Sequence, residues 1–169
     1  GQRSKSFATI CAEVGWQCSI LEGGYKCYRS QVLGNLAALS EELKIIIISG
    51  RTGTGKTRIL EELEKRGENI IDLEHLARHR GSLLGSLPGV EQPQQKLFET
   101  LLCNNFKSLK FQNPVFIEAE SSKIGNIQIP SPLWKAMRNS PQILVTSDRS
   151  KRAHYLLKDY DNLKTNQEG

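Results

Sequence analysis

The chain has 169 residues, of which 38% are hydrophobic and 24% are charged, a composition typical of globular domains. Its longest strictly aliphatic run, Ile45 to Ile48, is far too short to cross a bilayer, and no secretory leader is visible. The net charge of +5 arises entirely after residue 43, since the four basic and four acidic side chains before it cancel. This excess suits a polyanionic partner such as RNA or a diphosphate, although ordinary surface lysines would explain it equally well.

The four cysteines indicate neither a metal site nor a disulfide framework. They show no CxxC spacing and no nearby histidine pair, so we expect no structural metal. Lone thiols in a chain without a leader favour a reducing compartment, so we expect a cytoplasmic protein without membrane contact. The cysteines are Cys11, Cys18, Cys27 and Cys103.

The sequence of the N-terminal part indicates little regular structure. Apolar residues at helical spacing predict a helix over residues 6–14, which ends at Gly15. A short strand is expected over residues 18–21, and residues 31–43 resemble a connector with some helical character.

After residue 43 the pattern alternates between strands and helices. Such a rhythm predicts a parallel sheet with helices on both faces. A glycine-punctuated loop is expected over residues 74–89, and Pro93 lies where proline is tolerated before a helix. The expected strands cover residues 45–48, 69–73, 115–117 and 142–145, and the expected helices cover 56–66, 94–110, a short stretch from 131, and 150–160.

The segment GRTGTGKT at residues 50–57 matches the phosphate-loop pattern G-x-x-x-x-G-K-[ST] in full. Glycines allow backbone N–H groups to surround an anion, and the helix that follows presents its positive N-terminus to the same anion. Lys56 adds a charge, and the Thr57 hydroxyl is suited to Mg²⁺. The predicted phosphate-binding residues are Gly50, Gly53, Gly55, Lys56 and Thr57.

Acidic side chains follow two of the other predicted strands. Glu118 and Glu120 come at the end of the third strand, and Asp72 and Glu74 end the second in the same manner. In an open α/β sheet the carboxyl ends of the strands face one crevice. We therefore expect Asp72, Glu118 and Glu120 to supply acids or Mg²⁺ ligands near the loop; simple exposure at the sheet edge is the alternative.

Basic residues and histidines gather in the segment LEHLARHRGS at residues 73–82. Arg78, His79, Arg80 and Ser82 could bind a second anion through guanidinium and backbone N–H groups. A solvated loop would explain the same residues equally well.

Taken together, these segments resemble the bacterial tRNA 2-selenouridine synthases. The resemblance is carried by residues 50–57, 73–82, 116–125 and 132–137, and LEHLARHRGS is its most specific part. It implies a P-loop NTPase-like sheet preceded by the C-terminal remnant of a rhodanese-like α/β domain. The expected boundaries are 1–33 for the remnant, 34–43 for a linker and 44–169 for a C-terminally truncated P-loop domain.

The first residues fit this resemblance. Residues 21–28 look like the closing motif of a rhodanese domain, and residues 1–4 look like the tail of its active-site loop, with Arg3 as a further candidate for anion or tRNA contact. The catalytic cysteine would then lie upstream of residue 1. The catalytic residue is therefore unknown, and we expect no selenation activity from this chain alone.

The resemblance also implies a reaction. Wobble 2-thiouridine in tRNA would be S-geranylated with geranyl diphosphate and then converted to 2-selenouridine with selenophosphate, with Mg²⁺ as a candidate ion and no tightly bound cofactor. Two other classes stay open. One is a small-molecule or nucleoside kinase, in which Asp72 would orient the acceptor while Arg149 and Arg152 neutralise charge. The other is a non-catalytic phosphate- or RNA-binding module.

Overall fold

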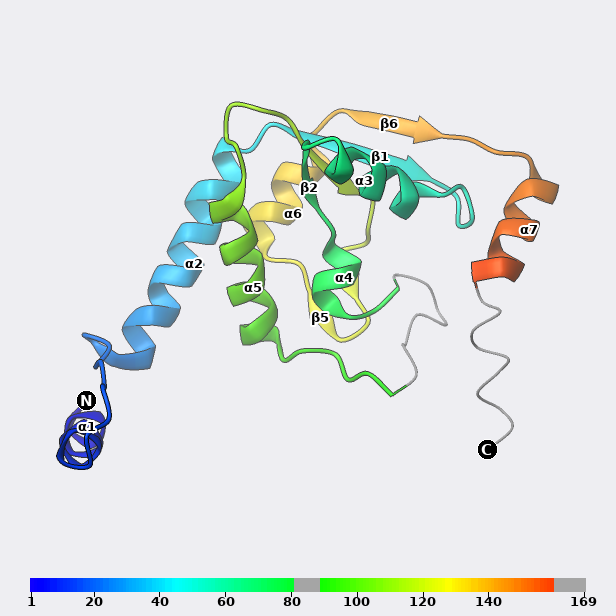
Figure 1. The fold of residues 1–169 in the computed structure, drawn as a ribbon. Coiled ribbons are helices and arrows are strands. Elements are labelled where there is room, and N and C mark those ends of the chain that lie inside the picture. The colour runs from blue at the N-terminus through cyan, green and yellow to red at the C-terminus, as the bar shows by residue number, and fades with distance from the viewer. Residues whose placement is uncertain (81–88, 160–169) are drawn as a thin grey trace, which may run out of the picture. The chain divides into compact units, whose positions relative to one another are not determined.

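The computed structural model describes residues 1–80 and 89–159 (Figure 1). The chain divides into two compact units, which are Gly1–Asn35 and Leu36–Gly169. The boundary between the two units falls within the residue range of helix α2 (Gly24–Glu42). None of the helices in the described part is long and apolar enough to cross a membrane.

The first unit contains α1 (Gln2–Glu13) and the first turns of α2. Helix α1 begins earlier than the periodicity predicts, so Arg3 lies in its first turn, and it buries Cys11. The strand expected over residues 18–21 does not form, and that prediction was wrong. A strand needs a hydrogen-bonded neighbour, and none pairs with these residues in the described structure.

The second unit is built on a parallel sheet of four strands. These strands lie in the order β2-β3-β1-β6, and every neighbouring pair is parallel. The predicted parallel α/β architecture is thereby confirmed. The strands are β1 (Ile45–Gly50), β2 (Asn69–Ile71), β3 (Val115–Glu118) and β6 (Gln142–Val145).

Connections in opposite directions place helices on both faces of this sheet. The chain leaves β1 through α3 toward β2, and later crosses from β3 through α6 to β6 on the other side of β1. Because parallel crossovers are right-handed, these two connections lie on opposite faces. The helices of this unit are α3 (Lys56–Lys65), α4 (Leu73–Ala77), α5 (Gln95–Ser108), α6 (Ser131–Arg138) and α7 (Arg149–Asp159).

The core lies between the sheet and these helices. Ile45, Ile47 and Ile48 of β1 are buried, as an aliphatic run in a central parallel strand should be. By contrast, β6 lies at the edge, with Ile143 49% and Leu144 69% exposed. Further fully buried side chains come from α5, β3 and α6, among them Phe98, Leu102, Phe106, Val115, Ile117 and Leu133.

A small antiparallel hairpin, β4 (Lys123–Ile124) with β5 (Ile127–Gln128), was not predicted. The Gln92 side chain donates to the carbonyl oxygens of Ala77 (3.2 Å) and Ile124 (3.1 Å) and accepts from the Asn126 N–H (2.8 Å). It therefore ties the hairpin to the end of α4, which lies within the basic segment of residues 73–82.

Candidate phosphate-binding site

The sheet register brings the phosphate loop beside the end of β3. Ile48 is aligned with Glu118, and the Ala119 N–H donates to the Ile48 carbonyl oxygen at 2.9 Å. The loop after β1 and the acids after β3 consequently leave the sheet side by side, at its carboxyl edge. This is where open α/β sheets bind their ligands.

The loop conformation depends on glycines at two positions. Gly53 and Gly55 have φ of 83° and 82°, in the left-handed region that side chains disfavour. Between them, the Thr54 hydroxyl donates to the Arg51 carbonyl oxygen at 2.8 Å and closes a tight turn. Helix α3 then begins at Lys56, so its first N–H groups are directed toward the loop.

Lys56 and Thr57 both contact the buried acid of β3. The Lys56 Nζ lies 3.2 Å from Glu118 Oε1, and the Thr57 hydroxyl donates to Glu118 Oε2 at 3.1 Å. Glu118 is only 6% exposed, so this ion pair is well shielded from solvent. The loop lysine is thus held in the pocket by a protein carboxylate.

Three carboxylates converge next to this ion pair. Oxygens of Glu74, Glu118 and Glu120 all lie within 4.8 Å of one another. Burial is the main reason that the pKa of Glu118 is raised, with the charge of Glu74 adding to it while Lys56 and Thr57 oppose it. For Glu120, burial and then the charges of Glu74 and Glu118 raise the pKa to about 8. Burial and mutual repulsion therefore both disfavour the charged forms of Glu118 and Glu120.

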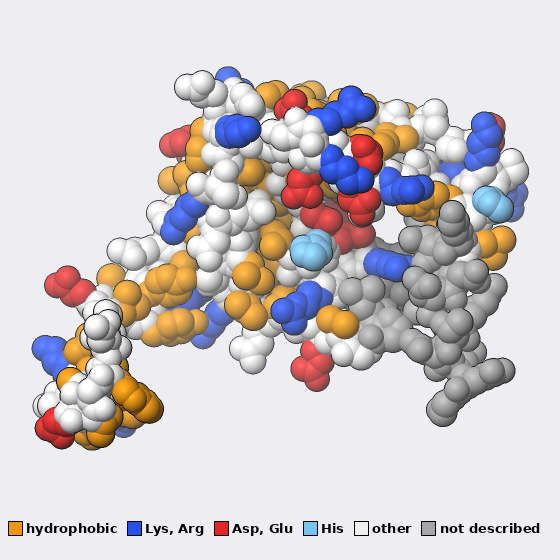
Figure 2. Space-filling model, in the orientation of Figure 1, with side chains coloured by type: hydrophobic (Ala, Val, Ile, Leu, Met, Phe, Trp, Pro, Cys, Tyr) orange, Lys and Arg blue, Asp and Glu red, His pale blue; other side chains and the backbone are white. Residues whose placement is uncertain are grey.

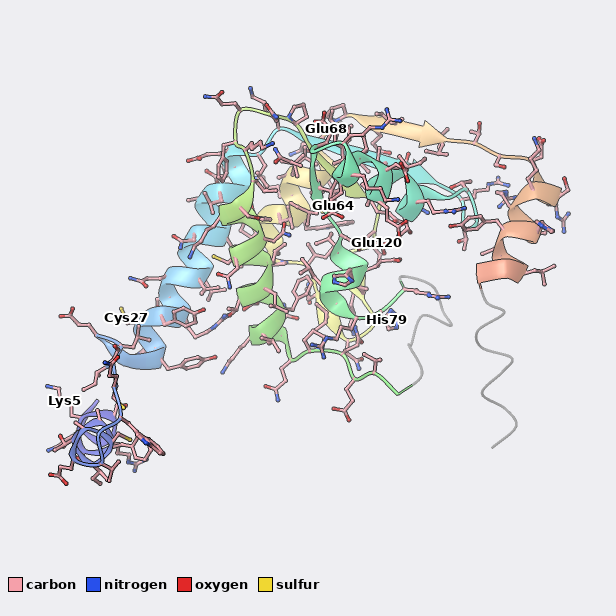
Figure 3. The ribbon with its side chains drawn as sticks, in the orientation of Figure 1. Lys5, Cys27, Glu64, Glu68, His79 and Glu120 are labelled. Atoms are coloured by element: carbon pink, nitrogen blue, oxygen red, sulfur yellow. The ribbon has the colours of Figure 1, made fainter. Side chains whose placement is uncertain are left out.

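The donor set fits a hard divalent cation. Mg²⁺ prefers oxygen ligands and is commonly held by one or two carboxylates and a phosphate. A cation here would also relieve the repulsion among the three carboxylates. Figure 2 shows red carboxylates gathered beside α3 and α4 with blue basic groups around them, and Figure 3 shows Glu120 beside α4 on the side toward α3.

The cavity above the loop has a volume of about 740 Å³ and brings together most of the predicted residues. Besides the loop and the carboxylates, α3 contributes Arg58 and Glu61, and the basic segment contributes Arg80. Arg80 thus lines the same cavity as the phosphate loop. The predicted residues that line the cavity are Gly50, Gly53, Gly55, Lys56, Thr57, Arg80, Glu118 and Glu120.

The other members of the basic segment are placed differently. Arg78 ends α4 with a left-handed φ of 51° and is exposed. His79 is half-buried, and its Nδ1 finds no hydrogen-bond partner among the described residues. Ser82 lies outside the described residues.

Asp72 and Arg3 are not among the residues that line the cavity. The Asp72 carboxylate caps α4, where it accepts the His75 N–H at 2.8 Å, and Glu74 of that helix joins Glu118 and Glu120 instead. Sequence reasoning placed Glu74 at the end of a strand without including it among the site residues. Arg3 is an exposed residue of the first unit.

Helix α7 supplies two lining residues that the sequence did not indicate, Tyr155 and Leu156. The helix is joined to the loop by a hydrogen bond from Arg152 Nη1 to the Thr52 carbonyl oxygen at 3.3 Å. Its amphipathic spacing was the available signal, but this spacing does not reveal which element the helix packs against.

A glycine-rich loop between a central parallel strand and a helix, with an acid on the neighbouring strand, defines a P-loop α/β domain. Comparison with known proteins narrows this class. Residues 43–168 match the tRNA 2-selenouridine synthase AAA domain, and the chain belongs to this family.

Relatives described as tRNA 2-selenouridine synthase are similar over almost the whole chain. The Nitrosomonas europaea protein is 34% identical over 163 residues, which cover 95% of this chain and 42% of that protein. The Marinobacter nauticus protein is 35% identical over 162 residues, which cover 95% of this chain and 43% of that protein. The Bdellovibrio bacteriovorus protein is 35% identical over 164 residues, which cover 95% of this chain and 42% of that protein. This chain spans less than half of the length of these relatives.

Proposed function

We propose that this chain holds the diphosphate of geranyl diphosphate during the S-geranylation of wobble 2-thiouridine in tRNA. The observation that carries the proposal is the phosphate loop whose Lys56 and Thr57 meet Glu118 in the 740 Å³ cavity. Phosphate groups are anions that such a loop and helix N-terminus can bind through their backbone N–H groups. Membership of the synthase family supplies the substrate class.

In the proposed step the thiouridine sulfur attacks C1 of the geranyl group. A C–S bond forms, the C1–O bond breaks, diphosphate leaves with the electron pair, and the N3 proton of the base is released. Negative charge thus grows on the diphosphate, where the loop N–H groups and Lys56 stabilise it. A Mg²⁺ held by Glu118, Glu120 and Glu74 would neutralise further charge.

Selenium then replaces the geranylthio group. Selenophosphate supplies selenium to C2, the C2–S bond breaks with release of geranylthiol, and water releases phosphate from selenium. We assign contact with tRNA phosphates or with the second anion to Arg78, His79, Arg80 and Ser82, and to Arg3. The proposed organisation retains a rhodanese-like remnant at 1–33, a linker at 34–43 and the P-loop domain at 44–169.

A kinase is less well supported by this geometry. Asp72, which would orient the acceptor of a kinase, instead caps α4 in this structure. A kinase would also consume ATP in the presence of a small hydroxylated acceptor without tRNA. A non-catalytic module would bind the same ligands without turnover.

The test is Lys56→Ala in the full-length protein, with geranyl diphosphate affinity and tRNA geranylation as readouts. Loss of a charged hydrogen-bond donor is worth about 1.5–3 kcal/mol, so the affinity should fall roughly ten- to a hundredfold. The matched control is Lys65→Ala on the same helix, since Lys65 is 67% exposed and paired with Glu62. Unchanged geranyl diphosphate affinity in Lys56→Ala would remove the loop from the reaction.

A further inference from the structure

The cavity above the phosphate loop has one apolar side. Its lining is dominated by glycines and by polar or charged groups, whereas the apolar and aromatic side chains among its lining residues are Ala119, Tyr155 and Leu156. Two of these three belong to consecutive positions of α7. Apolar surface is therefore concentrated where this helix meets the cavity.

This apolar side lies directly against the loop. A Cβ built on Gly53 would lie 2.9 Å from Leu156 Cγ and 2.8 Å from the Arg152 carbonyl oxygen. The Arg152 side chain holds the helix there through its bond to Thr52. Figure 1 shows α7 beside the loop that joins β1 to α3.

We propose that Tyr155 and Leu156 bind the hydrocarbon chain of an allylic diphosphate whose two phosphates occupy the loop. This inference rests on the proposed function and names the residues that select the substrate. The hydrocarbon of such a ligand begins one C–O bond from the phosphate, so it has to start within a few ångströms of the loop. A nucleotide presents its polar ribose at the same place.

The proposal separates affinity for the head of the ligand from affinity for its tail. Inorganic diphosphate reports on the loop alone, whereas geranyl diphosphate reports on the loop and the apolar side together. Burial of about two methylene groups of the ligand against the apolar side chains should raise its affinity roughly tenfold. Geranyl diphosphate should consequently bind at least about tenfold more tightly than inorganic diphosphate.

The experiment measures the affinity of the full-length protein for both ligands, and for a nucleoside diphosphate, in the presence of Mg²⁺. Leu156→Asn should weaken the binding of geranyl diphosphate at least about tenfold and leave the affinity for inorganic diphosphate within about twofold, because it removes the apolar contact without adding a charge beside the loop. The matched control is Leu157→Asn, because Leu157 is 62% exposed on the same helix and does not line the cavity. Leu156→Ala also removes the contact, which covers the case in which Leu156→Asn does not fold.

Each result decides between the two proposals. An equal loss of affinity for both diphosphates in Leu156→Ala and Leu156→Asn would overturn the tail-binding role and leave the proposed function standing. Equal wild-type affinity for the two diphosphates would do the same. If geranyl diphosphate does not bind wild-type protein while the nucleoside diphosphate does, the proposed function fails together with this inference.

Discussion

The carboxylate cluster should make the stability of the protein fall as the pH rises. Glu120 has an ordinary pKa of 4.5 and a folded-state pKa of about 8. Between these values the folded protein keeps a proton that the unfolded chain has lost. Unfolding then releases a proton, so the free energy of unfolding decreases with increasing pH across this window.

The size of this effect follows from the displacement of the pKa. A rise from 4.5 to about 8 would correspond to about 5 kcal/mol at most. Because Glu120 is only half-buried, solvent screens its neighbours, and about 2 kcal/mol is the realistic destabilisation at high pH. For a domain of this size, that corresponds to roughly 4–8 °C in Tm.

The perturbation is Glu120→Gln, which keeps the shape of the side chain and removes its charge. Thermal unfolding followed by circular dichroism from about pH 5 to about pH 8.5, without divalent cations, should show equal Tm at the acid end and a higher Tm for the variant at the alkaline end. Glu64→Gln is the matched control, since Glu64 is exposed on α3 and does not line the cavity. Parallel Tm profiles for wild type and Glu120→Gln would refute the reasoning.

Two other substitutions test the local geometry. Gly53→Ala should lower the free energy of unfolding in urea by about 1–3 kcal/mol more than Gly67→Ala does. Both glycines have a positive φ, of 83° and 80°, but an added Cβ would contact α7 at Gly53 and would meet open space at Gly67. Equal losses of stability would show that α7 does not pack on the loop. Asp72→Ala should cost about 1 kcal/mol through loss of the α4 cap and leave inorganic diphosphate affinity within about twofold. A tenfold loss of that affinity would instead give Asp72 a role in the site.

The phosphate loop could be predicted from the sequence because its signals are local. An aliphatic run from Ile45 to Ile48, a spaced set of glycines and an amphipathic helix after Lys56 lie next to one another in the chain. The strand predicted at residues 18–21 failed for the opposite reason: local apolar character does not supply a neighbouring strand. Helix α4 was missed because it has only five residues and follows directly after β2.

The carboxylate cluster depends on information that is not local. Glu74 reaches Glu118 and Glu120 because β2 pairs with β3, with Ile71 aligned to Ile117. The alternation of strands and helices predicts a parallel sheet but does not give the order of its strands. The hairpin of β4 and β5 did carry a local signal, the Gly125-Asn126 pair between isoleucines, which is typical of a two-residue turn.

The ion pair between Lys56 and Glu118 means that the loop already contains a competitor for its ligand. Any anion that takes Lys56 as its partner has to displace an internal carboxylate and leave Glu118 beside two further acids. A singly charged anion such as chloride offers Lys56 no gain over that carboxylate. A diphosphate that arrives with a divalent cation does offer one, because it brings several negative oxygens to the loop and a positive ion to the acids. In the proposed function, the pocket would therefore favour a metal-bound polyanion over the simple salts of the cell.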